Sequence, residues 1–364
     1  MKKIFTVLTS IALTFALSFS AAFANDDALM KSQNYLKTIT LDSPDAVIAY
    51  EATGMEADYK ADALLNNFKE TDYVTASYGD LAKSIIAISL LGENPKDFNN
   101  TNLVEILENR VQEDGTLTND VNGGCGATIW TLMALETVNS PKVKAVADKL
   151  STMAMDNGAY WYEYQGPNAD LDTTGWAMEA LSVAGRSTYK AAISKAYTFV
   201  QSKLNSTDGY YDNWGGNADT QSCVLEGLSV AGYTLDTNAY NYLLSYQNED
   251  GTFNALNYST GQLEPNAYAS VEGARALGVI NNGSFVLMAR RDYTNVVTEP
   301  ETPTTPTTPS TTTPAVKPET TTTEPKKETV KVVNTGDNTN VMAYVVAAIA
   351  AVGVIVLVIK SKKK

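Results

Sequence analysis

A short glycine-centred segment recurs four times along this chain and restricts the folds that it can adopt. The copies are QEDGTL (112–117), MDNGAY (155–160), STDGYY (206–211) and NEDGTF (248–253), so the glycines at 115, 158, 209 and 251 are 43, 51 and 42 residues apart. Each copy leads into a run rich in small and apolar residues, at 126–136, 172–185, 219–232 and 266–278. A period of this length is typical of folds that stack one supersecondary unit.

Segments between these runs have apolar residues at the spacing of an amphipathic helix, as at Tyr189, Ile193, Ala196 and Val200. Twelve helices are therefore expected, near 27–38, 44–53, 58–70, 78–92, 101–111, 125–137, 141–155, 172–184, 188–204, 219–232, 236–247 and 266–278. Small-residue helices alternate with long amphipathic ones, which favours an inner ring packed through Ala and Gly and an outer ring that covers it. We predict an all-α fold, an (α/α)6 toroid with six inner and six outer helices.

The first residues have the pattern of a secretion signal. Residues 1–24 begin with Lys2 and Lys3, continue with an apolar run and end in Ala22-Phe23-Ala24, as at a signal peptidase site. The segment is therefore excluded from the fold, and the toroid domain is expected at 25–295.

The last residues have the pattern of a surface anchor. Residues 296–334 are rich in Thr and Pro and predict an extended linker long enough to pass through a cell wall. In 335–364, the uncharged stretch 341–359 predicts a transmembrane helix, and the lysines after it predict a cytoplasmic tail. The membrane is thus one expected partner, and the domain is expected on the outer face of a Gram-positive-type cell, tethered to the membrane or anchored in the wall.

Charge and composition exclude several functions. Removing Lys2, Lys3 and the four tail lysines from 27 basic residues leaves 21 against 41 acidic ones, a net charge of −20 outside the cell, so nucleic acid is not an expected partner. The chain has no histidine, which excludes Ser-His-Asp and Cys-His nucleophile pairs and His-ligated zinc. We expect no metal and no cofactor. The sequence does not decide whether its two cysteines, Cys125 and Cys223, form a disulfide bridge.

Residues 26–293 resemble the α/α-toroid superfamily, which includes squalene and hopene cyclases, protein prenyltransferases and the thioester domains of complement-like proteins. The best-matched segment is YLLSYQNEDGTF (242–253), which is similar to the cyclase repeat of an aromatic residue and Leu, then Gln, then Gly-x-Trp. Leu243, Gln247 and Gly251 match, and Phe253 stands where that family has tryptophan. The resemblance implies the toroid fold more than any activity.

The segment 170–174 resembles the acidic motif with which class II terpene cyclases protonate an alkene. The resemblance implies that Asp172 is the general acid and that Asp170 orients it, although Thr173 stands where the motif has a second Asp. A carboxyl group with this role must be kept protonated by its surroundings. The alternative is that Asp172, and Asp219 in the next repeat, are ordinary helix N-caps.

The segment around Cys125 resembles the thioester motif Gly-Cys-Gly-Glu-Gln found on the same fold. Thr128 stands at the position of the required Gln, so no thioester is expected, and Cys125 is predicted to be a small buried residue. The zinc site of protein prenyltransferases needs a His that this chain does not have. That activity is therefore not expected.

Aromatic residues are concentrated in the loops that lead to two of the small-residue runs. They are candidates for binding a sugar ring or a protein partner, together with Asp219, because amphipathic rings stack on such ligands. The alternative is that they pack the loops onto the helix ends. The candidates are Tyr160, Trp161, Tyr162, Tyr164, Tyr211 and Trp214.

The sequence 332–336, VVNTG, is similar to a sortase sorting signal. Its Thr-Gly step predicts cleavage between Thr335 and Gly336 and a covalent link to peptidoglycan, although Val332 and Val333 replace the usual Leu and Pro.

Because every catalytic motif is incomplete, we expect a non-catalytic module that binds an extracellular glycan, small molecule or protein. The alternatives are a class II cyclase-like enzyme that uses Asp172, and a toroid enzyme that acts on polysaccharide through Tyr and Asp.

Overall fold

A computed structural model of the chain describes residues 26–56, 62–120, 123–162, 166–211 and 217–298, and all statements below concern these residues. They form thirteen helices and two small hairpins. The helices are α2 (Asp26–Leu36), α3 (Pro44–Ala52), α4 (Asp62–Glu70), α5 (Tyr78–Leu90), α6 (Leu103–Asn109), α7 (Gly126–Thr137), α8 (Val143–Met153), α9 (Leu171–Gly185), α10 (Lys190–Ser202), α11 (Ala218–Ala231), α12 (Thr237–Ser245), α13 (Ala267–Asn282) and α14 (Phe285–Thr298). The strands are β1 (Leu204–Asn205), β2 (Gly209–Tyr210), β3 (Phe253–Asn257) and β4 (Gln262–Asn266).

The predicted all-α class is confirmed for these residues, because the twelve expected helices are all present, as α2 to α13. Two features were not expected. One is the pair of antiparallel hairpins, β1 with β2 and β3 with β4. The other is α14, which follows the last small-residue helix after a turn at Gly283.

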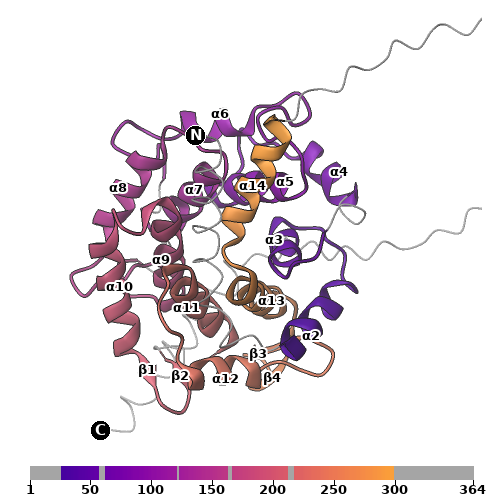
Figure 1. Ribbon diagram of the computed structural model, residues 1–364, viewed down its shortest axis with the longest axis vertical. Coiled ribbons are helices and arrows are strands. Elements are labelled where there is room, and N and C mark those ends of the chain that lie inside the picture. Colours follow the sequence, from indigo (N-terminus) through magenta and orange to yellow (C-terminus); the bar gives the residue numbers. More distant parts are fainter. Residues whose placement is uncertain (1–25, 57–61, 121–122, 163–165, 212–216, 299–364) are drawn as a thin grey trace, which may run out of the picture. The chain divides into compact units, whose positions relative to one another are not determined.

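Six helices contact one another in a closed series. These are the small-residue helices α3, α5, α7, α9, α11 and α13, each in contact with the next, and α13 in turn contacts α3 (Figure 1). Most of their residues are buried, and in α7 every residue is buried. The amphipathic helices lie outside this series: α8 contacts α7 and α9, and α10 contacts α9 and α11.

Glycine allows the closest approach in the series, between α9 and α11. A Cβ atom at Gly175 would lie 2.2 Å from the carbonyl oxygen of Cys223, and one at Gly227 would lie 2.2 Å from that of Gly175. The two backbones therefore touch directly, and any side chain at either position would separate the helices.

The recurring glycine of the repeat segment lies in close contact with the next amphipathic helix outside the closed series. Gly115 and Gly158 have positive φ values, and a Cβ atom there would collide with the backbone of Ala145 in α8 or Lys195 in α10. Gly251 makes the same contact with Lys31 in α2, the first described helix. The last repeat thus packs on the beginning of the domain, which closes the series.

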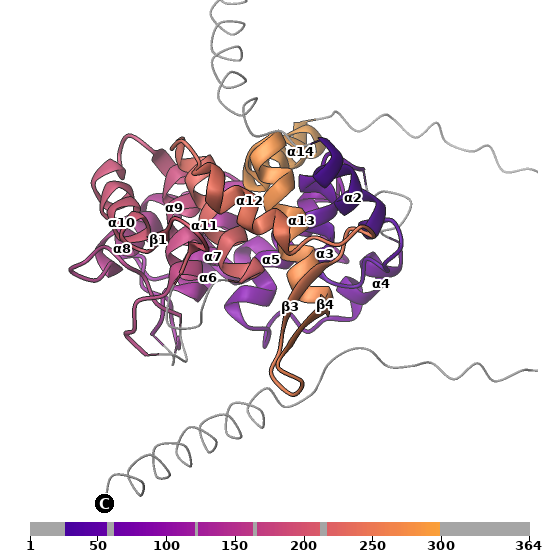
Figure 2. The same ribbon diagram turned by 90° about the horizontal axis from the view of Figure 1, so that it is seen from below.

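Helix α14 returns to the closed series and contacts α3, α5 and α7. Phe285 at its start is 1% exposed and stacks on Trp130 of α7, with ring centroids 6.3 Å apart. Ser284, just before the helix, donates to Glu179 of α9 over 2.8 Å, and Arg290 pairs with Glu136 of α7. Figure 2 shows α14 on one side of the series and the β3–β4 hairpin on the other.

Several predictions concern residues that the structure does not describe. They are the signal peptide at 1–24, the linker beyond residue 298, the sorting motif with Thr335 and Gly336, and the transmembrane stretch 341–359. Among the helices that are described, none has the length and apolar character needed to cross a membrane.

Candidate functional site

The six helices of the closed series are called the inner helices below. In two of them, α9 and α11, the N-cap residue lies two positions before the acidic candidates Asp172 and Asp219. Asp170 caps α9, where its Oδ1 accepts from the backbone N–H of Thr173 over 2.7 Å. Asn217 caps α11 in the same way, by accepting from Thr220 N–H over 2.8 Å. The alternative reading of Asp172 and Asp219 as N-caps was therefore wrong. The cap bond uses Asp170 Oδ1, and the role of Asp170 as an orienting partner stays a prediction.

One residue from each inner helix forms a layer across the closed series. Aligning the six helices without gaps places Asp45, Lys83, Trp130, Trp176, Cys223 and Glu272 at one register position. We call these six residues the inner layer. Lys83 Nζ lies 2.9 Å from Asp45 Oδ1 and 4.6 Å from the ring centroid of Trp130, and the Cys223 thiol donates to Glu272 Oε2 over 3.2 Å.

The residues three positions further along support this register. They are Ile48, Ile86, Met133, Glu179, Glu226 and Arg275, and every one of them is 0% exposed. Residues at i and i+3 share one face of a helix, so both layers lie on the faces that the inner helices turn toward one another. Half of this second layer is apolar and half is ionisable.

An aromatic cluster occupies one side of the inner layer. The rings of Trp130 and Trp176 meet edge to face with centroids 5.8 Å apart, and Tyr162 meets Trp176 at 6.5 Å. Trp176 is 9% exposed, and its indole Nε1 is buried with no hydrogen-bond acceptor in the described structure. A buried donor left unmatched costs about 1–3 kcal/mol, so this N–H is a place where a ligand acceptor would be bound favourably.

Two carboxyl groups lie one turn before the inner layer, at the second position of α9 and of α11: Asp172 and Asp219. Since Gly175 and Gly227 bring these helices into backbone contact, the two residues occupy matching places on adjacent helices. Burial, and then the charge of Glu272, raise the pKa of Asp219 to about 7. Its Oδ1 is buried and accepts no hydrogen bond from the described residues.

A buried charge cluster lies on the other side of Cys223. The guanidinium of Arg275 donates to Glu226 over 3.0 and 3.1 Å and to Glu272 over 3.0 and 3.1 Å. Glu179 completes the cluster, and burial together with the charge of Glu226 raises its pKa well above the usual value. The cluster links α9, α11 and α13, and it reaches α14 through Ser284.

The aromatic candidates of the sequence separate into different environments. Tyr160 is fully buried, and its backbone N–H donates to Thr174 Oγ1 over 2.9 Å, so it packs the loop onto α9 as the alternative supposed. Trp161 is partly buried against the core, and Tyr162 contacts Trp176. Tyr211 is 48% exposed, while Tyr210 beside it is fully buried. Tyr164 and Trp214 lie outside the described residues.

Both cysteines are buried, and the structure holds no disulfide between them. Cys125 is 0% exposed at the start of α7, as predicted for a packing residue. Burial, and then the charge of Glu272, raise the thiol pKa of Cys223 well above its usual value, which makes a reactive thiolate unfavourable. In the part of the chain that is described, no group of His, Cys, Asp or Glu side chains has an arrangement able to hold a metal ion.

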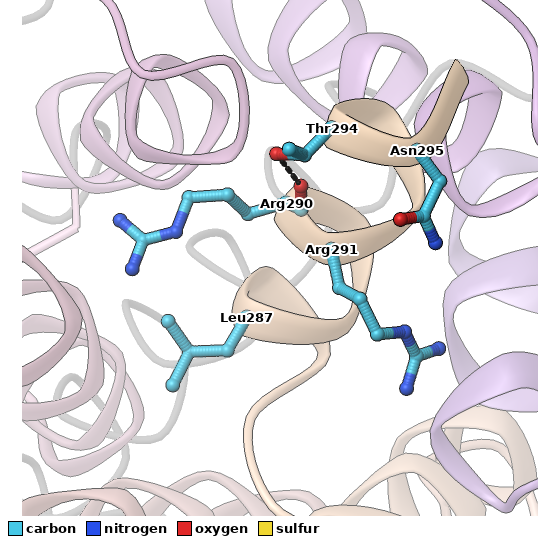
Figure 3. Close-up of a pocket in the computed structure, with 5 residues that line it drawn as sticks. All are labelled: Leu287, Arg290, Arg291, Thr294 and Asn295. Atoms are coloured by element: carbon cyan, nitrogen blue, oxygen red, sulfur yellow. Dashed lines mark hydrogen bonds between the residues drawn. The ribbon is translucent and has the colours of Figure 1, made fainter. Parts of the chain in front are cut away.

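A separate pocket of about 350 Å³ lies along α14 (Figure 3). It is lined by Leu287, Arg290, Arg291, Thr294 and Asn295. Arg290 pairs with Glu136, and Arg291 donates to the neighbouring Asp292 over 2.8 and 3.1 Å, so both guanidinium groups already have carboxylate partners. Sequence reasoning missed both this pocket and the inner layer, because neither α14 nor the exact register of the helices was known.

Comparisons with known proteins add little to this geometry. No protein-family model matches the sequence, and no curated protein matches it. Among solved structures, a protein from Actinoplanes is similar with a TM-score of 0.44 and 12% sequence identity, over 76% of this chain and 99% of that one.

Proposed function

We propose that the chain is an α/α-toroid module that binds a ligand without transforming it. In this proposal the closed series of inner helices is the inner ring, and the ligand lies against the inner layer at the end where the inner helices begin. The observation that carries the proposal is the pair of buried, unmatched polar atoms at that end, Trp176 Nε1 and Asp219 Oδ1. Folded proteins match nearly all such atoms, so an unmatched pair at one end of the inner helices calls for an explanation, which a bound ligand would supply.

The arrangement of charge favours binding over catalysis. The carboxylate of Asp170 is used as a helix cap, and the thiol of Cys223 is held protonated, so neither supplies a base or a nucleophile. Helix α14 packs against α3, α5 and α7, and the β3–β4 hairpin is on the opposite side (Figure 2). We therefore place the ligand on the side of the hairpin.

We further propose that the module is displayed outside a Gram-positive-type cell. The signal peptide at 1–24 would direct secretion, the Thr/Pro linker at 296–334 would act as a stalk, and the stretch 341–359 would tether the chain to the membrane. Sortase cleavage between Thr335 and Gly336 would add a link to peptidoglycan. The net negative charge makes nucleic acid an unsuitable partner, and the proposal invokes no cofactor.

A binding screen tests the proposal. The purified full chain would be titrated with panels of glycans, isoprenoids and corrinoids, with Trp176→Leu as the site variant and Tyr258→Ser as the control, since Tyr258 is 81% exposed on the hairpin loop. The expected result is a ligand whose affinity falls in Trp176→Leu alone. Equal affinity for both variants, or no ligand in any panel, would contradict the proposal, whereas release of sugar fragments would favour a polysaccharide-acting enzyme.

A cyclase-like enzyme is the second candidate, and one observation favours it. The pKa of Asp219 is raised to about 7, so part of this carboxyl group is protonated at neutral pH, one helical turn before the layer that contains two tryptophan rings. The general acid would then be Asp219, with Asp172 at the matching place on α9 as its neighbour. Turnover of a linear polyprene that is abolished by Asp219→Asn and by Asp172→Asn would establish this function.

A further inference from the structure

We propose that the inner-layer site binds an ammonium group on a ligand that also carries a hydrogen-bond acceptor, such as a hydroxylated quaternary amine. This inference rests on the proposed binding function and specifies its ligand class. It follows from the Asp219 carboxyl in the first turn of α11, the Trp130–Trp176 aromatic pair one turn further along the inner helices, and the unmatched indole N–H of Trp176.

The charges at this end are unbalanced. Among the described residues, the basic groups of the two layers are Lys83 and Arg275, and their ion pairs go to Asp45, Glu226 and Glu272. Neither cation pairs with Asp219, whose buried Oδ1 accepts no hydrogen bond. A cation supplied by the ligand would offset the burial of this carboxylate, whereas an anion would be repelled by it and would find Lys83 and Arg275 already paired.

The aromatic cluster already holds one ammonium group. Lys83 Nζ lies 4.6 Å from the ring centroid of Trp130, a distance at which the face of an indole attracts a cation. Trp176 continues the cluster from Trp130 onto α9, the helix that carries Asp172 and packs against α11, and Tyr162 contacts Trp176. An aromatic wall beside carboxylates is the arrangement that recognises substituted ammonium ions.

The indole N–H specifies the rest of the ligand. Trp176 is more than nine-tenths buried between Trp130 and Tyr162, and its Nε1 finds no acceptor in the described residues. An indole N–H donates and never accepts, so the ligand must supply an acceptor to match it, such as a hydroxyl, ether or carbonyl oxygen. A ligand with an ammonium group alone would leave this donor unmatched.

The proposal also fixes how binding depends on pH. The charged groups that act on Asp219 are Glu272 and Arg275 of α13, and Asp172 of α9 acts on Cys223, which follows Asp219 on α11. Because burial raises the pKa of Asp219 to about 7, a cation must displace a proton below that pH. Affinity for a permanent cation should therefore rise from pH 5.5 to about pH 7.5 and then level off.

Choline tests the inference, because it carries a permanent ammonium charge and a hydroxyl oxygen. Its neutral isostere, 3,3-dimethyl-1-butanol, has the same shape without the charge, and tetramethylammonium has the charge without the oxygen. Binding to the full chain would be measured by calorimetry or by saturation-transfer NMR. We expect the isostere to bind at least about tenfold more weakly than choline, because it lacks the charge that would pair with the Asp219 carboxylate.

Three variants make the test specific. Asp219→Asn should weaken choline binding about tenfold or more and remove its pH dependence, while Glu249→Gln, an exposed carboxylate elsewhere, should change neither. Trp176→Phe keeps a ring but removes the N–H, so it should weaken choline about two- to tenfold and leave tetramethylammonium unchanged.

Equal binding of choline and its isostere, or no binding of choline, would overturn the inference. If a glycan, isoprenoid or corrinoid binds through Trp176 while choline does not, the ammonium inference fails and the binding module stands. If nothing in either experiment binds, the binding function itself fails.

Discussion

The Asp219 carboxyl is expected to destabilise the folded chain at neutral and higher pH, so Asp219→Asn should stabilise it there. Burial raises the pKa of this group from 3.8 to about 7 on folding. The folded chain thus holds the proton more tightly than the unfolded chain. Stability from this group is fully present below about pH 4 and is lost as the pH rises to about 7, because the ionised group is favoured in the unfolded state.

The size of the effect follows from the shift in pKa. A difference of about 3 pH units corresponds to about 4 kcal/mol, at 1.36 kcal/mol for each unit. The side chain is partly exposed, and solvent screening reduces this to about 2 kcal/mol. About two-thirds of that, or about 1.4 kcal/mol, should develop between pH 5 and pH 7, since two of the three units lie in this interval.

Urea unfolding followed by far-ultraviolet circular dichroism at pH 5, 6, 7 and 8 would measure the effect. The gain in free energy of unfolding from Asp219→Asn should increase by about 1.4 kcal/mol from pH 5 to pH 7 and then stay constant. Glu249→Gln, which removes an exposed carboxylate, should show almost no change with pH. A pH-independent difference for Asp219→Asn, or a loss of stability at pH 8, would refute the assignment of a buried and uncompensated carboxyl to this residue.

Three further substitutions test the packing of the domain by the same unfolding measurement. Gly227→Ala should lower the free energy of unfolding by about 2 kcal/mol or more because its Cβ would meet the Gly175 carbonyl oxygen at 2.2 Å, whereas Gly79→Ala, with only Ser77 Oγ at 3.8 Å, should be neutral or stabilising. Arg275→Met should cost about 3–5 kcal/mol, since it leaves buried carboxylates unpaired; a cost below 1 kcal/mol would contradict the charge cluster. Phe285→Ala should cost about 3–5 kcal/mol if α14 is an integral part of the fold, and an unchanged midpoint would show that it is not.

The helices were predictable because their causes are local. Small-residue runs and amphipathic spacing repeat along the chain. In the structure the small-residue runs form buried helices, and the amphipathic segments form half-buried ones. Helix α14 was missed because the recurring glycine segment does not precede it and because Arg290, Arg291 and Asp292 give it a polar middle next to the Thr/Pro linker. Its burial depends on contacts with α5 and α7, far away in sequence.

The site was harder to predict, because it depends on register. Polar residues at 168, 170 and 172 could each cap α9, and only the backbone geometry selects Asp170. This choice moves Asp172 and Asp219 from the caps into the first turn. The inner layer also includes Asp45 and Lys83, whose repeats lack the glycine segment that anchors the later copies, so no alignment tied them to Trp130 and Trp176.

The second layer explains why α14 fits this domain. Ile48, Ile86 and Met133 make one half of the layer apolar, while Glu179, Glu226 and Arg275 make the other half polar. The start of α14 meets both halves with adjacent residues: Phe285 stacks on Trp130 beside the apolar half, and Ser284 donates to Glu179 in the polar half. Phe285 also lies under the guanidinium of Arg275, 6.0 Å from the centroid of its ring. Phe285 and Ser284, one apolar and one polar, therefore match the apolar and polar halves of the second layer. Together they position α14 in one register against the inner helices.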